Sequence, residues 1–355
     1  MGVTIKQIAQ IVGVSRGTVD RVIHGRSGVS QEIKGKIEQV MGELNYSPNA
    51  VAKALKTVQT PMTFGVIVPG NNKFYDDIRI GIDEAAQTYA PYGVSIIKLE
   101  EEDLTEQRQL IQLKNLEKLN VNGIIMVAVD APAVRKCVNS IAEHIPIITY
   151  NSDLTDTKRL CFIGQDHIAA GRVSGDLMGM ILRRNGKIAI LAGSRNMLAH
   201  MQRADGFRAA LRARGVTGVL SEIYATQESD DKAYEIVTRL IATYDDLVAI
   251  CVTGGGKVGA GNALSDSGKA DNIKLACYDT LPETVQHIKT GVVDYTIAQD
   301  PFIQGYMPVK IMYEYLTYGI LPKWERILTR IDIRVKDNIE NKGYEVFTGK
   351  YSNKI

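Results

Sequence analysis

The segment 4–23, TIKQIAQIVGVSRGTVDRVI, carries two short helical patterns separated by Gly13. Thr4 stands three residues before Gln7, the spacing of a capping box, so a helix is predicted to start at the next residue. Gly13 can adopt the positive φ that ends a helix, and Ser15 is a suitable cap for a second one. The apolar residues at helical spacing are Ile5, Ile8, Ala9, Val12, Val19, Val22 and Ile23. The pattern predicts a tight helix-turn-helix.

The second helix leaves a polar face directed outward. Its residues are Arg16, Gly17, Thr18, Asp20 and Arg21. Arginine can bind guanine or phosphate, threonine can contact a thymine methyl group, and glycine lets the backbone approach a groove. A small helical bundle that contacts protein, or nothing, is the alternative for a helix pair alone. The outward face favours a helix that reads DNA.

The following residues extend this region into a headpiece. Ser30 is predicted to cap a third helix whose apolar positions, from Ile33 to Leu44, follow the 3.6-residue period. The segment 46–57, YSPNAVAKALKT, suits a helix but is too short to be stable without a packing partner. We therefore expect a conditional helix there, with a domain boundary at Thr60-Pro61.

Charge is distributed unevenly along the chain. The 355 residues carry a net charge of +2, but residues 1–60 hold eight Lys and Arg against four Asp and Glu. This places positive charge where a phosphate-binding face is expected. The start, MGVTIKQ, lacks the basic and apolar regions of a signal peptide, and no apolar run reaches membrane-spanning length. We expect a cytoplasmic protein.

The four cysteines and five histidines show no metal-ligand spacing. Cys161, Cys251 and Cys277 lie in apolar, strand-like runs, so buried thiols are expected rather than disulfides or metal ligands. Surface or capping roles are expected for the histidines. No metal, cofactor or catalytic residue is predicted.

From Phe64 onward, short aliphatic strands alternate with amphipathic helices, which predicts an α/β fold of parallel sheets flanked by helices. The strands are more than one sheet comfortably holds, so we expect two lobes, with ligands at the carboxyl ends of the strands. Lobe 1 is predicted at about 61–163 plus 298–325, and lobe 2 at about 164–297 plus 326–355. The predicted strands are 64–69, 94–99, 123–128, 145–149, 159–163, 187–192, 218–224, 249–252, 273–278 and 295–298, and the predicted helices include 75–89, 106–119, 168–184, 203–214 and 231–243.

Loops after the strands collect carboxylates, amides, one arginine and aromatic rings. Such groups suit a polyhydroxylated ligand, because each hydroxyl donates and accepts while apolar CH faces stack on rings. The predicted ligand-binding residues are Asn71, Phe74, Tyr75, Asp130, Asn151, Arg203, Thr253, Tyr278, Asp279 and Gln299. Taken singly, an Asp or Asn at such a position is better explained as a helix N-cap. The convergence of these residue types favours a small sugar or polyol.

The N-terminal segments VTIKQIAQIVGVSRGTVDRVIHG and ELNYSPNAVAKALKT resemble the headpiece and hinge of the lactose/galactose repressor (LacI/GalR) family of bacterial transcription regulators. RADGF, GAGNAL and the segment 278–312 are similar to the periplasmic sugar-binding-protein fold in its ribose-binding form. The resemblance implies a homodimer that places two recognition helices in successive major grooves of a near-palindromic operator in double-stranded DNA. It implies a headpiece at 1–47, a hinge helix and linker at 48–60, and an effector-binding and dimerisation domain at 61–355.

The resemblance also implies individual contacts. Leu55 of the hinge matches a leucine that inserts into the minor groove, and folding of the hinge on DNA would let a ligand control affinity. Asp20 stands where Ser is usual, and is expected to read a cytosine amino group or to fold back onto a neighbouring Arg. Thr253 stands where Asn is common, which leaves room for a larger or differently substituted ligand. The predicted DNA contacts are Thr4, Ser15, Arg16, Gly17, Thr18, Arg21, Asn49, Ala52 and Leu55.

One rival signal points to an enzyme. The segment 254–259, GGGKVG, satisfies GxGxxG after a strand, and Asp279 follows about twenty residues later, as in dinucleotide-binding folds. The motif lies deep in the chain, and no nucleophile elbow is present. The prediction is therefore a non-enzymatic, ligand-responsive DNA-binding regulator, a repressor whose operator affinity is controlled by a small sugar or polyol between two lobes. The alternative is an enzyme acting on a sugar or nucleotide, with an appended DNA-binding head.

Overall fold

The computed structural model describes residues 5–23, 28–44, 61–70, 73–101 and 104–340. They belong to two compact units, an N-terminal headpiece and a larger α/β domain. The segment predicted as a hinge helix, at 48–60, lies outside the described residues.

The headpiece consists of α1 (Ile5–Val12), α2 (Arg16–Ile23) and α3 (Gln31–Glu43). Gly13 has a φ of +74° and ends α1, while the Oγ of Ser15 accepts the N–H of Thr18 at 3.1 Å. Ser30 caps α3 by accepting the N–H of Ile33. The buried core is Ile8, Ala9, Val19, Val22 and Ile37. These observations confirm the predicted helix-turn-helix, although Thr4 of the expected capping box lies outside the described residues.

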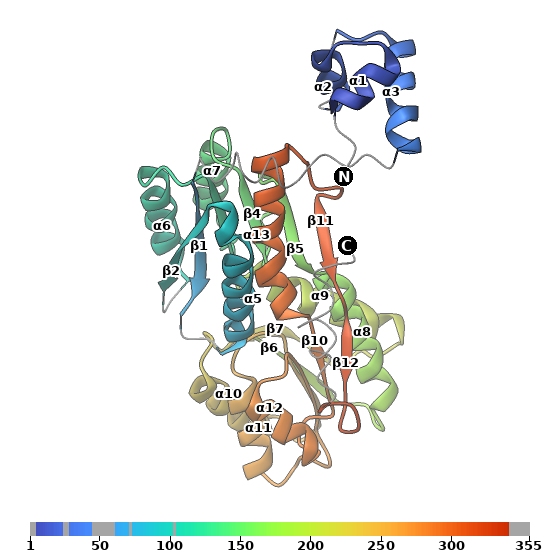
Figure 1. Ribbon diagram of the computed structural model, residues 1–355. Helices are drawn as coiled ribbons and strands as arrows, with labels where there is room; N and C mark the ends of the chain where they lie inside the picture. The colour runs from blue at the N-terminus through green and yellow to red at the C-terminus, as the bar shows by residue number, and fades with distance from the viewer. Residues whose placement is uncertain (1–4, 24–27, 45–60, 71–72, 102–103, 341–355) are drawn as a thin grey trace. The chain divides into compact units, whose positions relative to one another are not determined.

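The first lobe of the larger domain is built on a six-stranded parallel sheet in the order β11-β5-β4-β3-β1-β2. Two helices, α5 (Phe74–Tyr89) and α13 (Pro301–Tyr318), pack on one face (Figure 1). The opposite face carries α6 (Glu106–Lys118) and α7 (Pro132–Ile141). The strands are β1 (Met62–Pro69), β2 (Val94–Glu101), β3 (Gly123–Met126), β4 (Ile147–Tyr150), β5 (Cys161–Gln165) and β11 (Arg326–Thr329).

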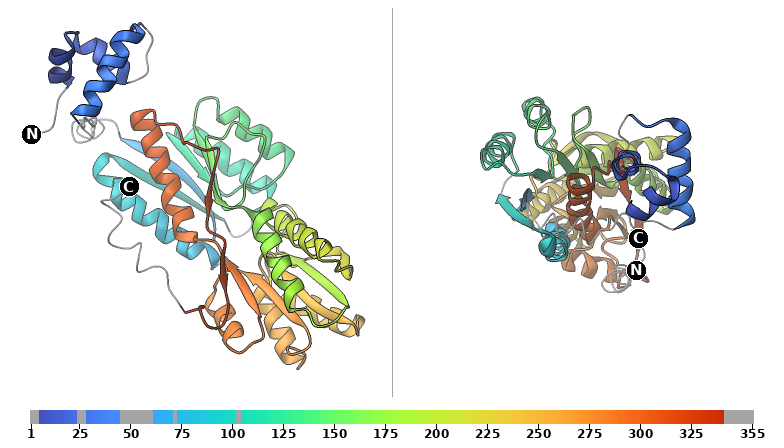
Figure 2. Two further views of the ribbon diagram at one scale, coloured as in Figure 1. Left: turned by 90° about the vertical axis from the view of Figure 1, so that its right-hand side faces the viewer. Right: turned by 45° about the horizontal axis from the view of Figure 1, so that its top comes forward.

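The second lobe, which includes the yellow and light-orange elements of Figure 2, repeats this arrangement. Its strand order is β12-β10-β9-β8-β6-β7, and β12 alone is antiparallel to its neighbour. One face carries α8 (His167–Ile181) and α9 (Leu198–Ala213). The helices of the other face are α10 (Asp230–Thr243), α11 (Lys257–Asp266) and α12 (Pro282–Lys289). The strands are β6 (Lys187–Ala192), β7 (Val219–Ala225), β8 (Leu247–Val252), β9 (Lys274–Tyr278), β10 (Tyr295–Ala298) and β12 (Asp332–Arg334). The predicted α/β class with two lobes is confirmed.

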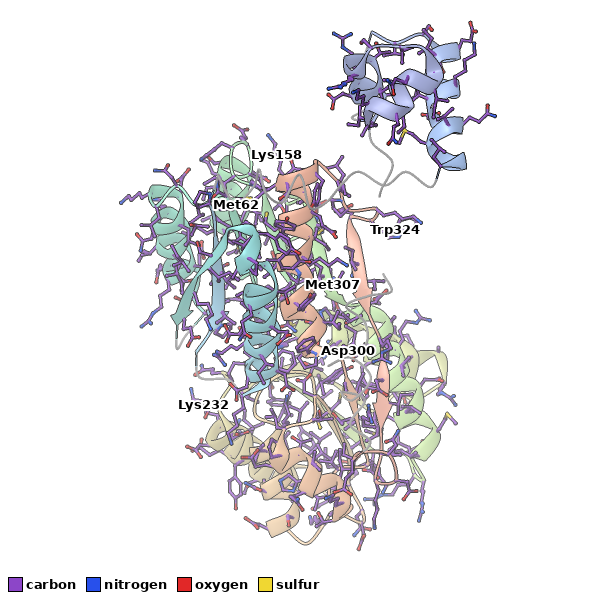
Figure 3. The ribbon with its side chains drawn as sticks, in the orientation of Figure 1. Met62, Lys158, Lys232, Asp300, Met307 and Trp324 are labelled. Atoms are coloured by element: carbon purple, nitrogen blue, oxygen red, sulfur yellow. The ribbon has the colours of Figure 1, made fainter. Side chains whose placement is uncertain are left out.

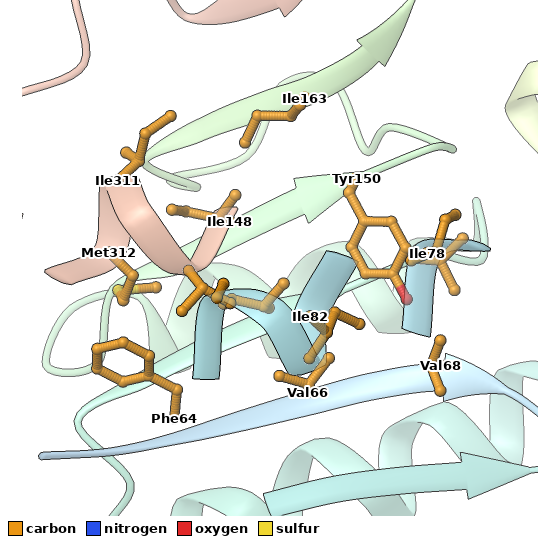
Figure 4. Packing of buried hydrophobic residues seen from close by; sticks show 14 of the residues in the cluster. Phe64, Val66, Val68, Ile78, Ile82, Ile148, Tyr150, Ile163, Ile311 and Met312 are labelled. Atoms are coloured by element: carbon orange, nitrogen blue, oxygen red, sulfur yellow. The ribbon is translucent and has the colours of Figure 1, made fainter. Parts of the chain in front are cut away.

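Strand β1 shows how the apolar pattern builds the core. Alternate residues Phe64, Val66 and Val68 point to the face covered by α5 and α13 (Figure 4). Ile67, between two of them, packs in the cluster beneath α6 and α7. Because both faces are covered, the strand is a nearly continuous hydrophobic run, as is typical of parallel sheets.

The chain passes between the lobes three times, after β5, after β10 and between β11 and β12. The side-chain amide of Gln165, fully buried, donates to the carbonyl oxygens of Ala298 at 3.0 Å and Arg330 at 2.9 Å. It thereby joins all three crossings. Asp300, which is labelled in Figure 3, lies at the N-terminus of α13. Its carboxylate accepts two hydrogen bonds from Arg330.

The last crossing lies later than the predicted start of lobe 2 at residue 326. Strand β11 pairs in parallel with β5, so residues 326–329 belong to the first sheet. Neither β11 nor β12 was among the predicted strands, because both are short and partly exposed. Helix α9 begins at Leu198, five residues before the predicted start at Arg203.

Among the residues described, no helix combines the length and the apolar character needed to cross a membrane.

Candidate functional site

The outer face of the headpiece helix α2 has the predicted division of side chains. Val19 and Val22 are buried, whereas Ser15, Arg16, Gly17 and Arg21 are exposed and Thr18 is partly exposed. Ser15 and Thr18 also bind each other through their hydroxyls at 2.9 Å, which fixes the first turn. Arg16 and Arg21 therefore stand on one rigid helix and are accessible to a partner. The other predicted DNA contacts, Thr4, Asn49, Ala52 and Leu55, lie outside the described residues.

The larger domain contains a cavity of about 610 Å³ at the carboxyl ends of strands from both sheets. Loops after β1, β4, β6, β7, β8, β9 and β10 contribute to its wall. This is where ligands of parallel α/β sheets bind. Six of the predicted ligand-binding residues line it, namely Phe74, Tyr75, Asn151, Arg203, Asp279 and Gln299.

A chain of hydrogen bonds runs across the cavity from one lobe to the other. The Tyr75 hydroxyl donates to Oδ1 of Asn151 at 3.2 Å, and Nδ2 of Asn151 donates to Oε1 of Gln299 at 3.3 Å. Nε2 of Gln299 donates to Oδ1 of Asp279 at 2.6 Å, and Nζ of Lys257 donates to its Oδ2 at 2.7 Å. Asn151 and Asp279 have φ values of +60° and +70°, which their short polar side chains tolerate. Local backbone geometry thus directs both side chains into the network.

Electrostatics keep Asp279 ionised although it is only 8% exposed. Burial disfavours its charged form, but Lys257 and Arg203 outweigh this effect and lower the pKa of the carboxyl group. Arg203 lies on α9 with its guanidinium carbon 4.2 Å from the centre of the Tyr278 ring. A Cβ at Gly171 would stand 2.3 Å from the backbone oxygen of Arg203, so only glycine there lets α8 approach α9 this closely.

Three predicted ligand-binding residues do not line the cavity. Asp130 pairs instead with Arg135, whose Nε donates to Oδ1 at 3.1 Å. Thr253 is fully buried, and its backbone oxygen accepts a hydrogen bond from Nη1 of Arg203. Tyr278 is buried beneath the same arginine. Thr253 and Tyr278 both contact Arg203 and so position it, and their direct contact with a ligand stays a prediction. Asn71 lies outside the described residues.

Several residues of the cavity wall were not predicted. Lys257 stands in the glycine-rich segment that resembled a dinucleotide motif, and only its pairing with distant Asp279 reveals its role. His200 precedes Arg203 by one turn and was expected to have a surface or capping role, but it is only 9% exposed. Burial lowers the pKa of His200, and its Nδ1 accepts the N–H of Ser194 at 3.1 Å. Glu228 completes this side of the wall and accepts the N–H of Gly255 at 3.1 Å.

His167 is a second histidine whose expected surface or capping role is corrected. It is 1% exposed at the start of α8, and its Nε2 contacts the backbone oxygen of Asn151 at 2.6 Å. Burial holds the pKa of its imidazole well below the usual value, so the ring is neutral near pH 7 and Nε2 is the donor. A neutral histidine thus links the start of α8 to a residue of the cavity wall.

The buried thiols agree with the sequence. Cys161, Cys251 and Cys277 are free and buried, and burial raises the pKa of each to about 12, 12 and 11 respectively. No group of three or more His, Cys, Asp or Glu side chains that could hold a metal ion occurs within the described ranges.

Comparison with known families matches both parts of the chain. The profile of bacterial regulatory proteins of the lacI family matches residues 4–49, and the periplasmic binding protein domain matches residues 64–319. The chain belongs to the lacI family. As a member of this family it is a DNA-binding transcriptional regulator with a periplasmic-binding-protein-like domain. The predicted family is thus confirmed, and the GGGKVG segment is part of the wall of this domain's cavity.

Curated relatives of this lacI-family chain are regulators. It is 28% identical over 262 residues to the HTH-type transcriptional regulator MalR of Streptococcus pneumoniae, covering 71% of this chain and 76% of the relative. It is 25% identical over 271 residues to catabolite control protein A of Staphylococcus aureus, covering 76% and 79% respectively.

Solved structures of sugar-binding proteins share the fold of the larger domain. A glucose-galactose binding protein from Geobacillus stearothermophilus has a TM-score of 0.73 at 21% identity, covering 79% of this chain and 99% of that protein. A solute binding protein from Bacillus halodurans with bound myo-inositol has a TM-score of 0.71 at 22% identity, covering 80% and 97%.

Proposed function

We propose that this regulator responds to a small polyhydroxylated effector, a monosaccharide or polyol, that binds in the cavity between the two lobes. This proposal rests on the composition of the cavity wall. There the buried ring of Phe74 lies beside a hydrogen-bonded set of amide, hydroxyl and carboxylate groups. Rings bind apolar CH faces and the polar groups bind hydroxyls that both donate and accept. Proteins of the same fold that bind glucose, galactose or myo-inositol support this ligand class.

The DNA side of the proposal places α2 in the major groove. Arg16 and Arg21 are exposed on that helix, where an arginine can bind guanine bidentately or bind phosphate. Thr18, partly exposed, is the candidate for a thymine methyl contact, with Gly17 allowing close approach. A homodimer on a near-palindromic operator would use two such helices. Because its partner is chromosomal DNA, we propose that the protein acts in the cytoplasm.

Coupling between the two sites follows from the position of the cavity. Its wall includes residues of both lobes, so a ligand that contacts both favours the conformation in which they stand closest. Effector and operator affinities are then linked reciprocally. We propose that the segment at 48–60 transmits the change, with Leu55 contacting the minor groove, and that the protein is a repressor.

The effector is bound without being chemically changed. The buried polar groups of the wall are held in place by one another, as the Lys257–Asp279 and Gln299–Asp279 contacts show. Such groups bind hydroxyls, and the buried cysteines, with pKa values raised to about 12 and 11 at Cys251 and Cys277, are not activated nucleophiles. Turnover of a bound sugar by the purified protein would refute this non-enzymatic role.

Operator binding by the full-length protein, measured by fluorescence anisotropy with and without each of a panel of monosaccharides and polyols, tests the proposal. Phe74→Ala is expected to weaken effector binding by about 1–3 kcal/mol through loss of buried ring surface, and to leave effector-free operator affinity unchanged. Leu55→Ala is expected to weaken operator binding and to leave effector binding unchanged. An operator affinity that Leu55→Ala does not change would refute the minor-groove contact. A panel in which no compound alters operator binding would refute the sugar response.

A further inference from the structure

Arg203 lies in the cavity wall, and part of its guanidinium group makes no hydrogen bond to the described residues. Its side chain is buried, and Nη1 donates to the backbone oxygen of Thr253 at 3.0 Å. Its Nε and Nη2 are also buried and have no hydrogen-bond partner among the described residues. An unsatisfied buried donor costs free energy, and the cost is greater for a charged group. This edge therefore lacks the acceptor that a buried cation requires among the residues that the structure describes.

The same edge of arginine binds carboxylates elsewhere in this protein. Nε and Nη2 of Arg159 donate to the two oxygens of Asp153 at 2.6 and 2.7 Å. Nε and Nη2 of Arg330 donate to the two oxygens of Asp300 at 2.9 and 3.1 Å. Two parallel N–H bonds to two oxygens are the bidentate geometry that makes arginine selective for planar anions. Arg203 lines the cavity, and no carboxylate of the described residues lies on its Nε–Nη2 fork.

The charge of the buried groups points to the same ligand. Arg203, Lys257 and Asp279 line the cavity and are 2%, 5% and 8% exposed, so the cations outnumber the carboxylate by one. Both oxygens of Asp279 are already bound, one by Lys257 and the other by Gln299. An isolated buried charge is unfavourable unless it is paired. One further negative charge would balance the set.

His200 and Glu228 also line the cavity, and neither changes this balance of buried charge. Burial lowers the pKa of His200, so it adds no positive charge near neutral pH. The side chain of Glu228 is 37% exposed, and its carboxylate accepts the N–H of Gly255. Water therefore solvates Glu228, whereas Arg203 is shielded from water.

We propose that the effector is a sugar acid, a polyhydroxylated compound whose carboxylate binds Nε and Nη2 of Arg203. This rests on the proposed function, because it specifies the ligand class of the same cavity. A carboxylate supplies the one negative charge that the buried groups lack. A phosphate monoester carries about 1.5 to 2 negative charges, which exceeds that balance and would stand near Asp279 and Glu228.

Calorimetric titration of the full-length protein at fixed ionic strength tests the assignment. Each set holds one sugar skeleton constant: D-glucose, D-glucuronate, D-glucuronamide and D-glucose 6-phosphate, the same four forms of galactose, and the aldonates gluconate and galactonate. At least one acid is expected to bind about tenfold or more tightly than both its neutral parent and its amide, because charge-assisted bidentate bonds exceed neutral ones.

Two arginines of the same helix provide the variant and its control. Arg203→Lys keeps the positive charge and removes the fork, so the affinity for the acid is expected to fall about tenfold or more while the neutral parent is affected less. Arg208→Lys is the matched control, since Nη2 of Arg208 donates to the backbone oxygens of Leu220 and Ser221 and the residue does not line the cavity. It is expected to leave the preference for the acid unchanged. Thermal unfolding of each variant verifies that it is folded.

The outcomes separate this inference from the proposed function. A neutral sugar or polyol that binds as tightly as the acid, or a 6-phosphate that binds more tightly, overturns the carboxylate assignment and leaves a sugar-responsive regulator in place. An acid preference that survives Arg203→Lys overturns the role of Arg203. If no compound of the series binds while operator binding is intact, both the inference and the sugar response fail.

Discussion

The two lobes contribute different chemistry to one cavity. Phe74, Tyr75 and Asn151 of the first lobe are buried and uncharged, whereas Arg203 and the Lys257–Asp279 pair of the second lobe are buried and charged. The ion pair lies within one lobe, so its desolvation is complete before any ligand arrives. The second lobe thus carries a preformed charged surface, while the first supplies rings and neutral hydrogen-bonding groups. Closure of the lobes then brings no buried ions together.

The largest expected effect comes from breaking the charged pair of the second lobe. Asp279→Asn leaves the ammonium group of Lys257 buried without its carboxylate, and is expected to lower the free energy of unfolding by about 3–5 kcal/mol. Chemical denaturation of the full-length protein measures this loss. Asp176→Asn is the control, because the ion pair between Asp176 and Arg214 is exposed and water screens it. Equal losses of unfolding free energy for the two substitutions would show that burial does not increase the contribution of the Lys257–Asp279 pair to stability.

An intermediate effect is expected from His167, which joins the start of α8 in the second lobe to Asn151 of the first lobe. Because burial lowers the pKa of His167, its stabilising contribution is fully present above the ordinary value of 6.5 and is lost as pH falls below it. One such group contributes a slope of up to about 1.4 kcal/mol per pH unit. His167→Gln, which can still donate to Asn151, should flatten the dependence of unfolding free energy on pH between about 6.5 and 5. His144→Gln is the control, since His144 is 54% exposed, and a slope equally reduced by both variants would contradict the assignment.

The smallest effect is expected from Tyr75 in the first lobe, whose buried residues at the cavity are uncharged. Tyr75→Phe removes the hydroxyl that donates to Asn151, which should cost about 0.5–1.5 kcal/mol of stability, with little dependence on salt. Denaturation at two ionic strengths measures both quantities. Tyr234→Phe, which removes an exposed hydroxyl bound to Asp266, is the control. A strong salt dependence for Tyr75→Phe would mean that the first lobe also recognises charge.

The sequence was sufficient for the parts of the fold that depend on local pattern. The runs at Lys187–Ala192 and Tyr295–Ala298 were predicted with the bounds that the structure shows, because short aliphatic segments between helices suit buried parallel strands. Strands β11 and β12 escaped prediction because their positions at sheet edges leave many side chains exposed. Helix α11 was missed because its first residues, Lys257-Val258-Gly259, continue a glycine-rich segment.

The site shows a similar division. Arg203, Asp279 and Asn151 were found because polar residues after strands, or in the RADGF segment, stand out locally. Lys257 and His167 were missed because their partners, Asp279 and Asn151, are brought to them only by the packing of the sheets. The contact between Tyr278 and Arg203 could not be predicted for a related reason, since only the folded structure brings the ring and the guanidinium group together. Contacts between residues that are far apart in the sequence cannot be predicted from the spacing of residues along the chain.

The amide of Gln165 has a consequence for how the lobes can move. It holds the carbonyl oxygens of Ala298 and Arg330 beside the end of β5, so the three connecting segments are fastened together at one buried point. Segments fastened in this way share a pivot, and we expect the lobes to swing about it more readily than they slide. The fold would then set the axis of the motion, and a bound effector would set only the angle.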